Sequence, residues 1–272
     1  MSAKKELITS VQNAQVKNLV KLHESKHRRE QGLFIIEGFR LIEAALNPDT
    51  NSLFELDTLY YCDELLGATG QKLLKSLSKK SIETQAVNTA VFNKITTQQN
   101  PQGMLLTAKT KSTELESLKP QSDTLYLVLE GLEKPGNLGA ILRTADAVGV
   151  DAVICTDGIT DIFNPQCIQN SMGSVFNVPV VLSSSLAVFE WLQKNEIVSV
   201  ASTPKAKKLY TDIKTPKRMA LIMGSEDLGL TPFWLENATE KVAIPMRAHM
   251  DSLNLATATA ILLYGLKGHQ IA

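Results

Sequence analysis

The sequence predicts an α/β protein of two domains, and three observations support this prediction. Short apolar segments alternate with segments of helical periodicity along most of the chain. Residues 124–130, Thr-Leu-Tyr-Leu-Val-Leu-Glu, form an apolar run that is typical of a strand buried in a parallel sheet. Residues 110–123 are polar and show no strand pattern, so we interpret them as a linker. The first domain therefore covers residues 1–109 and the second covers residues 124–272.

The composition is that of an ordinary globular protein, with 44% hydrophobic and 21% charged residues. Lys+Arg and Asp+Glu both number 28, which argues against a protein that coats nucleic acid non-specifically but allows a local basic surface. The three cysteines are too few and too scattered for a disulfide framework or a Cys-x-x-Cys metal site. The first six residues lack the apolar core of a secretion signal, and no apolar run could span a bilayer. We expect a cytoplasmic protein.

The first domain begins with a basic segment, and we expect one helix over residues 18–29. Lys17 and Lys21 are four residues apart and share a helix face, which Arg28 joins two turns later, with Arg29 beside it. These four cations are a candidate RNA-binding surface that would contact phosphates. A solvated helix surface without a ligand is the alternative.

Short strands and helices follow in the rest of the first domain. Strands are expected at residues 32–38, 58–62 and 104–108, and helices at residues 39–46 and 71–77. No catalytic constellation stands out in this half. Glu37 and Gly38 could be functional, but a turn at the end of a strand explains them equally well.

The second domain is expected to alternate between strands and helices. The expected strands are residues 124–130, 152–155, 176–182, 197–201, 218–224 and 242–246, and the expected helices are residues 140–148, 164–173, 186–193 and 255–266. In open α/β sheets, ligands bind beyond the carboxyl ends of the strands. The residues expected along this rim are Asn137, Arg143, Thr203, Gly224, Glu226, Ile244 and Ser252.

A loop with three glycines, residues 131–139, joins the first of these strands to a helix. This order is found in phosphate-binding and nucleotide-binding sites, but neither Gly-x-Gly-x-x-Gly nor a Walker Lys-Ser/Thr is present. Arg143 follows on the helix, within an otherwise apolar face. An arginine so close to a buried face needs an anionic partner, so a structural ion pair and a ligand contact are the two alternatives.

The last expected helix is preceded by Ser252 and Asn254, and either residue could cap it by accepting a bond from a backbone N–H. A helix N-terminus also presents backbone donors and a partial positive charge to a ligand. A capped core helix without a ligand is the simpler interpretation of these residues alone.

Three segments of the second domain together resemble the SpoU (TrmH-type) family of RNA ribose 2′-O-methyltransferases, within the SPOUT superfamily. The first is Asn-Leu-Gly-Ala-Ile-Leu-Arg-Thr-Ala at residues 137–145. The second is Leu-Ile-Met-Gly-Ser-Glu-Asp-Leu-Gly-Leu at residues 221–230, which runs on to Ile-Pro-Met at residues 244–246. The third is Ser-Leu-Asn at residues 252–254 with the helix after it. The first domain resembles, more loosely, the ribosomal-protein-like α/β domain with which many members hold RNA.

The resemblance implies a deep trefoil knot in the second domain and a homodimer whose site draws on both subunits. It also implies that S-adenosylmethionine is the cofactor and that no metal is needed. By motif position, backbone around Gly224, Ile244 and Leu253 should hold the cofactor. Thr203, Met246 and Ala258 should lie nearby.

The resemblance also implies which residues act on the substrate. Arg143 would be the residue at the ribose 2′-hydroxyl, where family members are often assigned a base. Because a guanidinium normally stays protonated, we expect it to bind the neighbouring phosphate and polarise the hydroxyl. Asn137, Glu226, Ser252 and Asn254 would position Arg143 and the ribose.

Two departures from the family pattern affect the RNA contacts more than the cofactor site. Gln169 stands where many members have arginine, and Ala256 stands where many have serine. The expected substrate is a structured RNA, with large-subunit ribosomal RNA favoured over transfer RNA on the resemblance of the first domain. A transfer RNA methyltransferase and a non-catalytic RNA-binding scaffold are the alternatives. A Rossmann-type nucleotide enzyme is disfavoured because the phosphate-loop fingerprint is absent.

Overall fold

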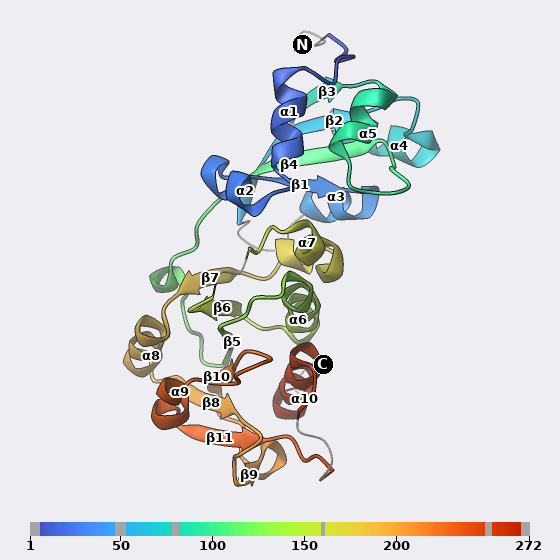
Figure 1. The fold of residues 1–272 in the computed structure, drawn as a ribbon. Helices are drawn as coiled ribbons and strands as arrows, with labels where there is room; N and C mark the ends of the chain where they lie inside the picture. Colours follow the sequence, from blue (N-terminus) through green and yellow to red (C-terminus); the bar gives the residue numbers. More distant parts are fainter. Residues whose placement is uncertain (1–5, 47–52, 78–81, 159–160, 248–251, 268–272) are drawn as a thin grey trace.

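The structure is a computed structural model of the chain, and it describes residues 6–46, 53–77, 82–158, 161–247 and 252–267. Two β-sheets with their helices lie end to end in an elongated molecule (Figure 1). The N-terminal sheet has four strands, and the C-terminal sheet has seven. This arrangement confirms the predicted α/β fold.

The N-terminal sheet has the strand order β1-β4-β2-β3, in which β4 is antiparallel to both of its neighbours. Its strands are β1 (Leu33–Glu37), β2 (Phe54–Tyr61), β3 (Glu83–Ala86) and β4 (Met104–Thr110). Its helices are α1 (Ala14–Lys21), α2 (Ser25–Gln31), α3 (Phe39–Leu46), α4 (Gly67–Leu77) and α5 (Thr89–Ile95). Side chains of β1 alternate between two clusters, with Phe34 and Ile36 in one and Ile35 in the other. Helices therefore cover both faces of this sheet.

The prediction of one helix over residues 18–29 is wrong, because the chain turns between α1 and α2. Val16, Leu19 and Leu22 are buried against the sheet, which fixes the end of α1. His23 then places its Nε2 atom 2.8 Å from the carbonyl oxygen of Ile95, and α2 starts at Ser25 in a new direction. The local sequence carries no breaker, so this tertiary contact is the physical reason for the difference.

The turn also removes Arg28 from the predicted RNA-binding surface. Arg28 is only 3% exposed. Its guanidinium donates to the carbonyl oxygen of Leu22 at 2.7 Å and to Asp161 of the second domain at 2.6 and 3.0 Å. Arg28 is thus a buried ion-pair partner between the domains and does not share a surface with Lys17 and Lys21, which are exposed on α1.

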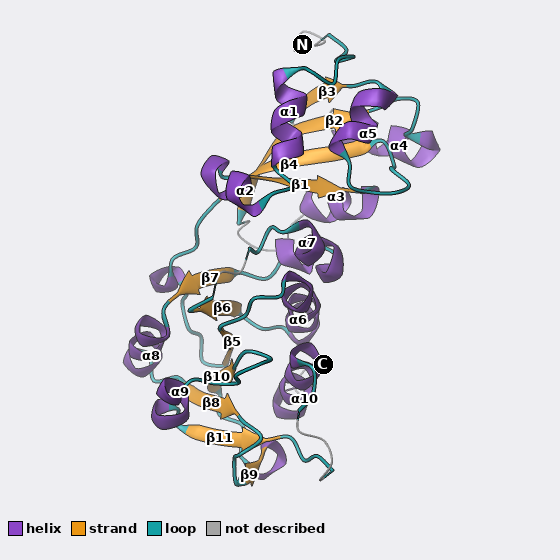
Figure 2. Ribbon diagram, viewed as in Figure 1, coloured by secondary structure: helices purple, strands orange, loops and turns teal. Residues whose placement is uncertain are grey.

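The C-terminal sheet has the order β7-β6-β5-β10-β8-β11-β9, and all of its pairings are parallel. Its strands are β5 (Thr124–Glu130), β6 (Ala152–Thr156), β7 (Val180–Ser183), β8 (Val198–Ser202), β9 (Lys208–Leu209), β10 (Arg218–Met223) and β11 (Glu240–Ala243). Its α-helices are α6 (Pro135–Val148), α7 (Pro165–Ser171), α8 (Ser185–Lys194), α9 (Pro232–Asn237) and α10 (Leu255–Lys267). Figure 2 shows α6 and α10 on one side of this sheet and α8 and α9 on the other.

Short 3-10 helices account for one difference from the predicted elements of the second domain. They span Leu115–Ser117, Ser174–Phe176 and Tyr210–Asp212. The second of them replaces the first part of the strand expected at residues 176–182, so that β7 begins only at Val180. Helix α6 begins at Pro135 rather than at residue 140, because proline at the first helical position already has a helical φ. Asn137 therefore belongs to the first turn of a helix and not to a loop.

An apolar interface joins the two sheets. The ring of Phe34 stacks on that of Phe163 with centroids 3.9 Å apart, and Phe54 meets Phe176 edge-on at 5.2 Å. One continuous hydrophobic cluster includes side chains from both sheets. The first sheet ends at Thr110 and the second begins at Thr124, which is where we propose the domain division.

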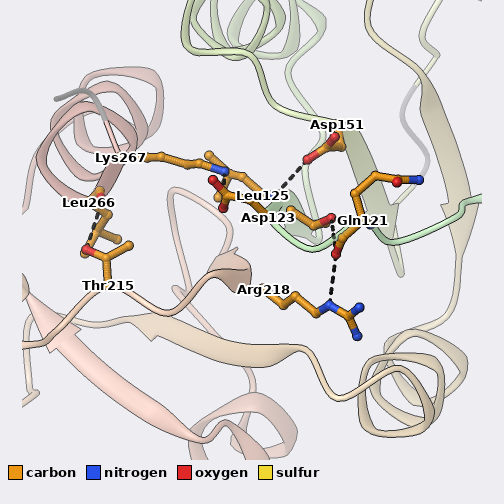
Figure 3. Close-up of polar contacts among 9 residues, drawn as sticks. Gln121, Asp123, Leu125, Asp151, Thr215, Arg218, Leu266 and Lys267 are labelled. Atoms are coloured by element: carbon orange, nitrogen blue, oxygen red, sulfur yellow. Dashed lines mark hydrogen bonds and ion pairs between the residues drawn. The ribbon is translucent and has the colours of Figure 1, made fainter. Parts of the chain in front are cut away.

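Polar contacts tie the start of the second sheet to the last helix and to β10 (Figure 3). Lys267 pairs with Asp123 at 3.0 Å, and the Thr215 hydroxyl donates to the carbonyl oxygen of Leu266 at 2.8 Å. Arg218 Nε donates to the carbonyl oxygen of Gln121 at 2.9 Å. The first two contacts hold the end of α10 near the starts of β5 and β10, and the third joins the starts of these two strands. The trefoil knot stays a prediction, since strand order alone does not define how the chain is threaded.

None of the helices that the structure describes is long and apolar enough to cross a membrane.

Candidate active site

The loop after β10 is the centre of the candidate site. It spans residues 224–230 and folds back on itself, because Ser225 and Gly229 exchange backbone hydrogen bonds of 3.1 and 3.0 Å. A Cβ atom on Gly224 would overlap the backbone of Gly229 and Leu230, so only glycine fits at the point where β10 ends. This fold-back carries Glu226 to the edge of the sheet at which the parallel strands end.

Glu226 gathers polar side chains from the other two motif segments. Asn254 Nδ2 donates to Glu226 Oε1 at 3.0 Å, and Asn137 Nδ2 donates to the same oxygen. Lys134 forms an ion pair with the other oxygen, Oε2. The Glu226 side chain is 18% exposed, so its charge is partly shielded from solvent. Residues far apart in the sequence thus meet on one carboxylate, and Asn137 and Glu226 lie together as expected for residues on one rim of the sheet.

Asn254 also caps the last helix. Its Oδ1 atom accepts hydrogen bonds from the backbone N–H groups of Ala256 at 3.0 Å and Thr257 at 3.3 Å. Of the two predicted caps, Asn254 and not Ser252 therefore occupies the position. One amide satisfies the start of α10 with its oxygen and holds Glu226 with its nitrogen, which fixes the helix end relative to the β10 loop.

Lys134 is a member of this cluster that the sequence analysis missed. Its hydrogen bond to Glu226, and then the negative charge of that carboxylate, raise the pKa of the Lys134 ammonium group. Lys134 precedes Pro135, and Asn137 follows three residues later, so both belong to the start of α6. Residues three apart at the start of a helix lie on neighbouring turns and can reach the same partner. This spacing between Lys134 and Asn137 was the signal in the sequence that could have identified Lys134.

A pocket of about 450 Å³ lies directly beside Glu226. Its walls come from the ends of β8 and β10, from the segment after β11 and from the segment that enters α10. All six residues expected to hold the cofactor line it: Thr203, Gly224, Ile244, Met246, Leu253 and Ala258. Glu226 and Ser252 line it as well. The structure therefore brings the cofactor candidates together in one concave site.

Arg143 lies outside the Glu226 cluster. It is exposed on α6, six residues beyond Asn137, which is about 9 Å along a helix axis. Its side chain forms no ion pair or hydrogen bond with any residue that the structure describes. Among the described residues, the structure therefore offers no structural ion pair, one of the two alternatives, for this arginine.

The two departures from the family pattern occupy different environments. Ala256 is half-buried in the first turn of α10, where its N–H is satisfied by Asn254. Gln169 is exposed on α7, and a small cavity there is also lined by Glu37 and Thr97 of the first domain. Gln169 thus lies where the two domains meet. Arg29 is exposed on α2 and lines the neighbouring interdomain pocket with Asn164.

Neither metal ligation nor thiol chemistry is built into the described part of the chain. No group of three or more His, Cys, Asp or Glu residues there could hold a metal ion. The three cysteines are free and buried, and burial raises the pKa of the Cys155 thiol to about 12. Cys155 is therefore a core residue.

Family models match most of the chain. Residues 124–264 match the model described as the SpoU rRNA Methylase family, and residues 13–106 match the MRM3-like substrate binding domain. The chain is 34% identical over 266 residues to an uncharacterized tRNA/rRNA methyltransferase of Synechocystis sp., which covers 97% of this chain and 94% of that relative.

Two further similarities extend over nearly the full length. The 23S rRNA (guanosine(2553)-2′-O)-methyltransferase RlmP of Bacillus subtilis is 29% identical over 261 residues, covering 96% of this chain and 99% of that protein. The crystal structure of an AdoMet-bound rRNA methyltransferase from Sinorhizobium meliloti superposes with a TM-score of 0.87 at 30% identity. That superposition covers 98% of this chain and 99% of the other.

Proposed function

Because the chain belongs to the SpoU rRNA methylase family, we propose that it transfers a methyl group from S-adenosylmethionine to a ribose 2′-hydroxyl of large-subunit ribosomal RNA. The observation that carries the proposal is the meeting of three motif segments on Glu226, at the edge of one pocket. Asn137 and Asn254 donate hydrogen bonds to Glu226, and Glu226 lines the pocket together with the cofactor candidates. The substrate class follows the names of relatives such as RlmP.

The pocket suits S-adenosylmethionine in size and in chemistry. Its volume of about 450 Å³ falls within the range of small-molecule sites, about 300–1,000 Å³. Ile244, Met246 and Leu253 supply apolar surface for a nucleobase. Gly224 carries no side chain, so the end of β10 lines the pocket there with backbone atoms alone. A neighbour with the same fold was crystallised with AdoMet bound.

The chain's own residues would prepare the hydroxyl and the cofactor for an in-line transfer. When bound, S-adenosylmethionine supplies an activated methyl group on a sulfonium. Arg143 would bind the phosphate next to the target ribose and stabilise the negative charge that develops on the 2′-oxygen. Glu226, through Asn137 and Asn254, would hold the start of α6 and the start of α10 at the distance that the transfer requires. Ser252, which lines the pocket, would contact the ribose or the cofactor.

We further propose a homodimer. The position of Arg143 supports this proposal, because within one chain it lies away from the Glu226 cluster and contacts none of its members. A second subunit placed against α6 and α10 would add the missing surface. The trefoil knot, a cytoplasmic location and phosphate contacts by Lys17, Lys21 and Arg29 belong to the same proposal.

The experiment that tests the function uses methyl-labelled S-adenosylmethionine with total RNA that lacks its own modifications. Ribosomal and transfer RNA are separated after the reaction, and the labelled product is tested for resistance to alkali, which marks a 2′-O-methyl nucleotide. Label in the large-subunit ribosomal RNA is the expected result. Label in transfer RNA would select the alternative substrate, and cofactor binding without any transfer would select the scaffold.

A further inference from the structure

A row of side-chain amides crosses from the first domain towards the candidate active site. Gln98 and Gln102 lie in the segment between α5 and β4, and Gln166, Gln169 and Asn170 lie on α7. Gln98 is half-buried, and the other four are exposed. We call these five residues the amide row.

The upper part of the row reaches the domain interface. A Cβ atom on Gly38 would lie 3.3 Å from Gln98 Nε2 and 3.4 Å from Gln102 Oε1, so both amides cover the end of β1. A small cavity at the domain interface is lined by Thr97, the residue before Gln98, and by Gln169 of α7. The segment that carries Gln98 and the helix that carries Gln169 therefore face the same cavity.

The lower part of the row ends at the candidate active site. A Cβ atom on Gly136 would lie 3.1 Å from Asn170 Nδ2 and 3.2 Å from Gln166 Nε2. Gly136 precedes Asn137, which donates to Glu226. In Figure 1, α3, α7, α6 and α10 follow one another along one side of the molecule. Helix α7, which carries three residues of the row, therefore lies between the first domain and α6, whose start contacts Glu226.

The two segments that carry the row are neutral. Residues 96–103 and 165–173 contain no Lys, Arg, Asp or Glu. Proteins bind the phosphates of nucleic acids mainly with Lys and Arg, so these segments are poorly suited to the RNA backbone. A planar amide carries a donor and an acceptor side by side, which matches the edge of an unpaired base.

The amide groups are largely available to a ligand. Three of the five side chains form no hydrogen bond with any residue that the structure describes. Gln102 accepts one bond, from the N–H of Phe39 at 2.8 Å, and Asn170 donates one, to the carbonyl oxygen of Gly136 at 3.2 Å. Each of these two amides therefore keeps one of its two polar ends for a ligand.

Buried contacts hold the row in place. Glu37, which is 9% exposed, accepts hydrogen bonds from the Thr96 hydroxyl at 3.0 Å and from the N–H of Thr97 at 3.2 Å. A Cβ atom on Gly139 of α6 would lie 2.5 Å from the carbonyl oxygen of Cys167, so α7 rests directly on α6. A surface fixed in this way loses little entropy when it binds a ligand.

We propose that the substrate RNA crosses α7 as an unpaired strand, and that the amide row hydrogen-bonds its base edges between the first domain and the pocket. This inference rests on the proposed function and names the part of the surface that contributes sequence preference. Lys and Arg elsewhere would contribute affinity without such preference, because phosphate contacts carry no sequence information.

The test compares the double variant Gln98→Ala/Gln169→Ala with the control Gln193→Ala. Gln193 is an exposed glutamine on α8, on the other side of the C-terminal sheet. The Kd for large-subunit ribosomal RNA transcribed in vitro is measured at several salt concentrations, and the Kd for S-adenosylmethionine is measured separately. For the double variant we expect the Kd for RNA to rise by about tenfold or more at each salt concentration, because the loss of one well-formed bidentate contact has an effect of this size. The dependence on salt and the affinity for S-adenosylmethionine should stay unchanged.

A second variant, Gln169→Lys, tests whether RNA passes this point at all. A new ammonium group beside the strand should steepen the plot of log Kd against log salt by about one phosphate contact. RNA affinities within about twofold of the control for the double variant, with an unchanged salt dependence for Gln169→Lys, would overturn the inference. A wild-type protein that binds S-adenosylmethionine but no large-subunit RNA would overturn the proposed function instead, and this inference with it.

Discussion

Replacing Glu226 by glutamine tests whether one carboxylate organises the candidate site. The change keeps the size of the side chain and removes its charge. In the wild type, Glu226 Oε1 accepts hydrogen bonds from Asn137 and Asn254. Hydrogen bonds to charged groups contribute about 1.5–3 kcal/mol and neutral ones about 0.5–1.5 kcal/mol, so each bond should weaken by about 1 kcal/mol. The amide N–H₂ of the new glutamine would also face the Lys134 ammonium group, a donor against a donor.

Two effects should follow from the loss of about 2 kcal/mol. The free energy of unfolding, measured with urea, should fall by about 1–2 kcal/mol, because the starts of α6 and α10 are held less firmly. The value of kcat for methyl transfer should fall by roughly 30-fold if the same energy positions the reacting groups. The Kd for S-adenosylmethionine should change much less, since the apolar pocket walls stay intact.

The control for this experiment is Glu240→Gln, which removes an acid that pairs with Lys208 on the far edge of the sheet. Surface ion pairs contribute little, so this variant should keep its stability and its kcat. Full activity and unchanged stability of Glu226→Gln would refute the reasoning, because the cluster would then be a consequence of packing and not a positioning device.

Four further predictions concern other parts of the molecule. Arg143→Ala should abolish methyl transfer while calorimetry shows unchanged cofactor binding, and retained transfer would contradict the role assigned to this residue. Gly224→Ala should weaken binding of S-adenosylmethionine strongly and lower the melting temperature, because a Cβ there overlaps backbone; a normal affinity would contradict that geometry. Arg28→Ala should cost about 3 kcal/mol in urea unfolding, since it leaves the largely buried carboxylate of Asp161 without its partner, and a loss under 1 kcal/mol would contradict the importance of this pair. Burial raises the pKa of Tyr126 to about 12, so this tyrosine ionises at a lower pH in the unfolded state than in the folded state. The free energy of unfolding should therefore fall as the pH rises from about 10 to about 12. Tyr126→Phe should reduce that fall, and an unchanged fall would show that Tyr126 is not its cause.

The sequence was most informative where chemistry is local or where several motifs coincide. The apolar run at residues 124–130 became β5, which is buried along its whole length. The six residues that the motif positions indicated for the cofactor line one pocket, although they come from four separate segments. Only glycine fits at position 224, because a Cβ atom there would overlap backbone atoms, and a sequence motif can show a requirement of this kind.

The features that the sequence did not predict depend on contacts between distant residues. Nothing within residues 18–29 indicates the turn between α1 and α2, because its cause is the contact of His23 with Ile95. Arg28 has the same local pattern as Lys17 and Lys21, and its burial is decided by Asp161, 133 positions away. Such partners are invisible to periodicity, which describes one element at a time.

The packed interface between the two domains gives these distant contacts a functional consequence. The stacked Phe34 and Phe163 rings, with the buried pair of Arg28 and Asp161, fix the first domain against the second. An RNA held by the first domain would then meet the pocket at a constant distance, so the choice of target nucleotide would depend on spacing as well as on base contacts. Weakening the interface with Phe163→Ala should therefore broaden the set of methylated positions more than it slows the reaction at the main one. Mapping of 2′-O-methyl positions by primer extension would show this, and a single unchanged position at proportionally lower yield would refute the idea that the interface sets the spacing.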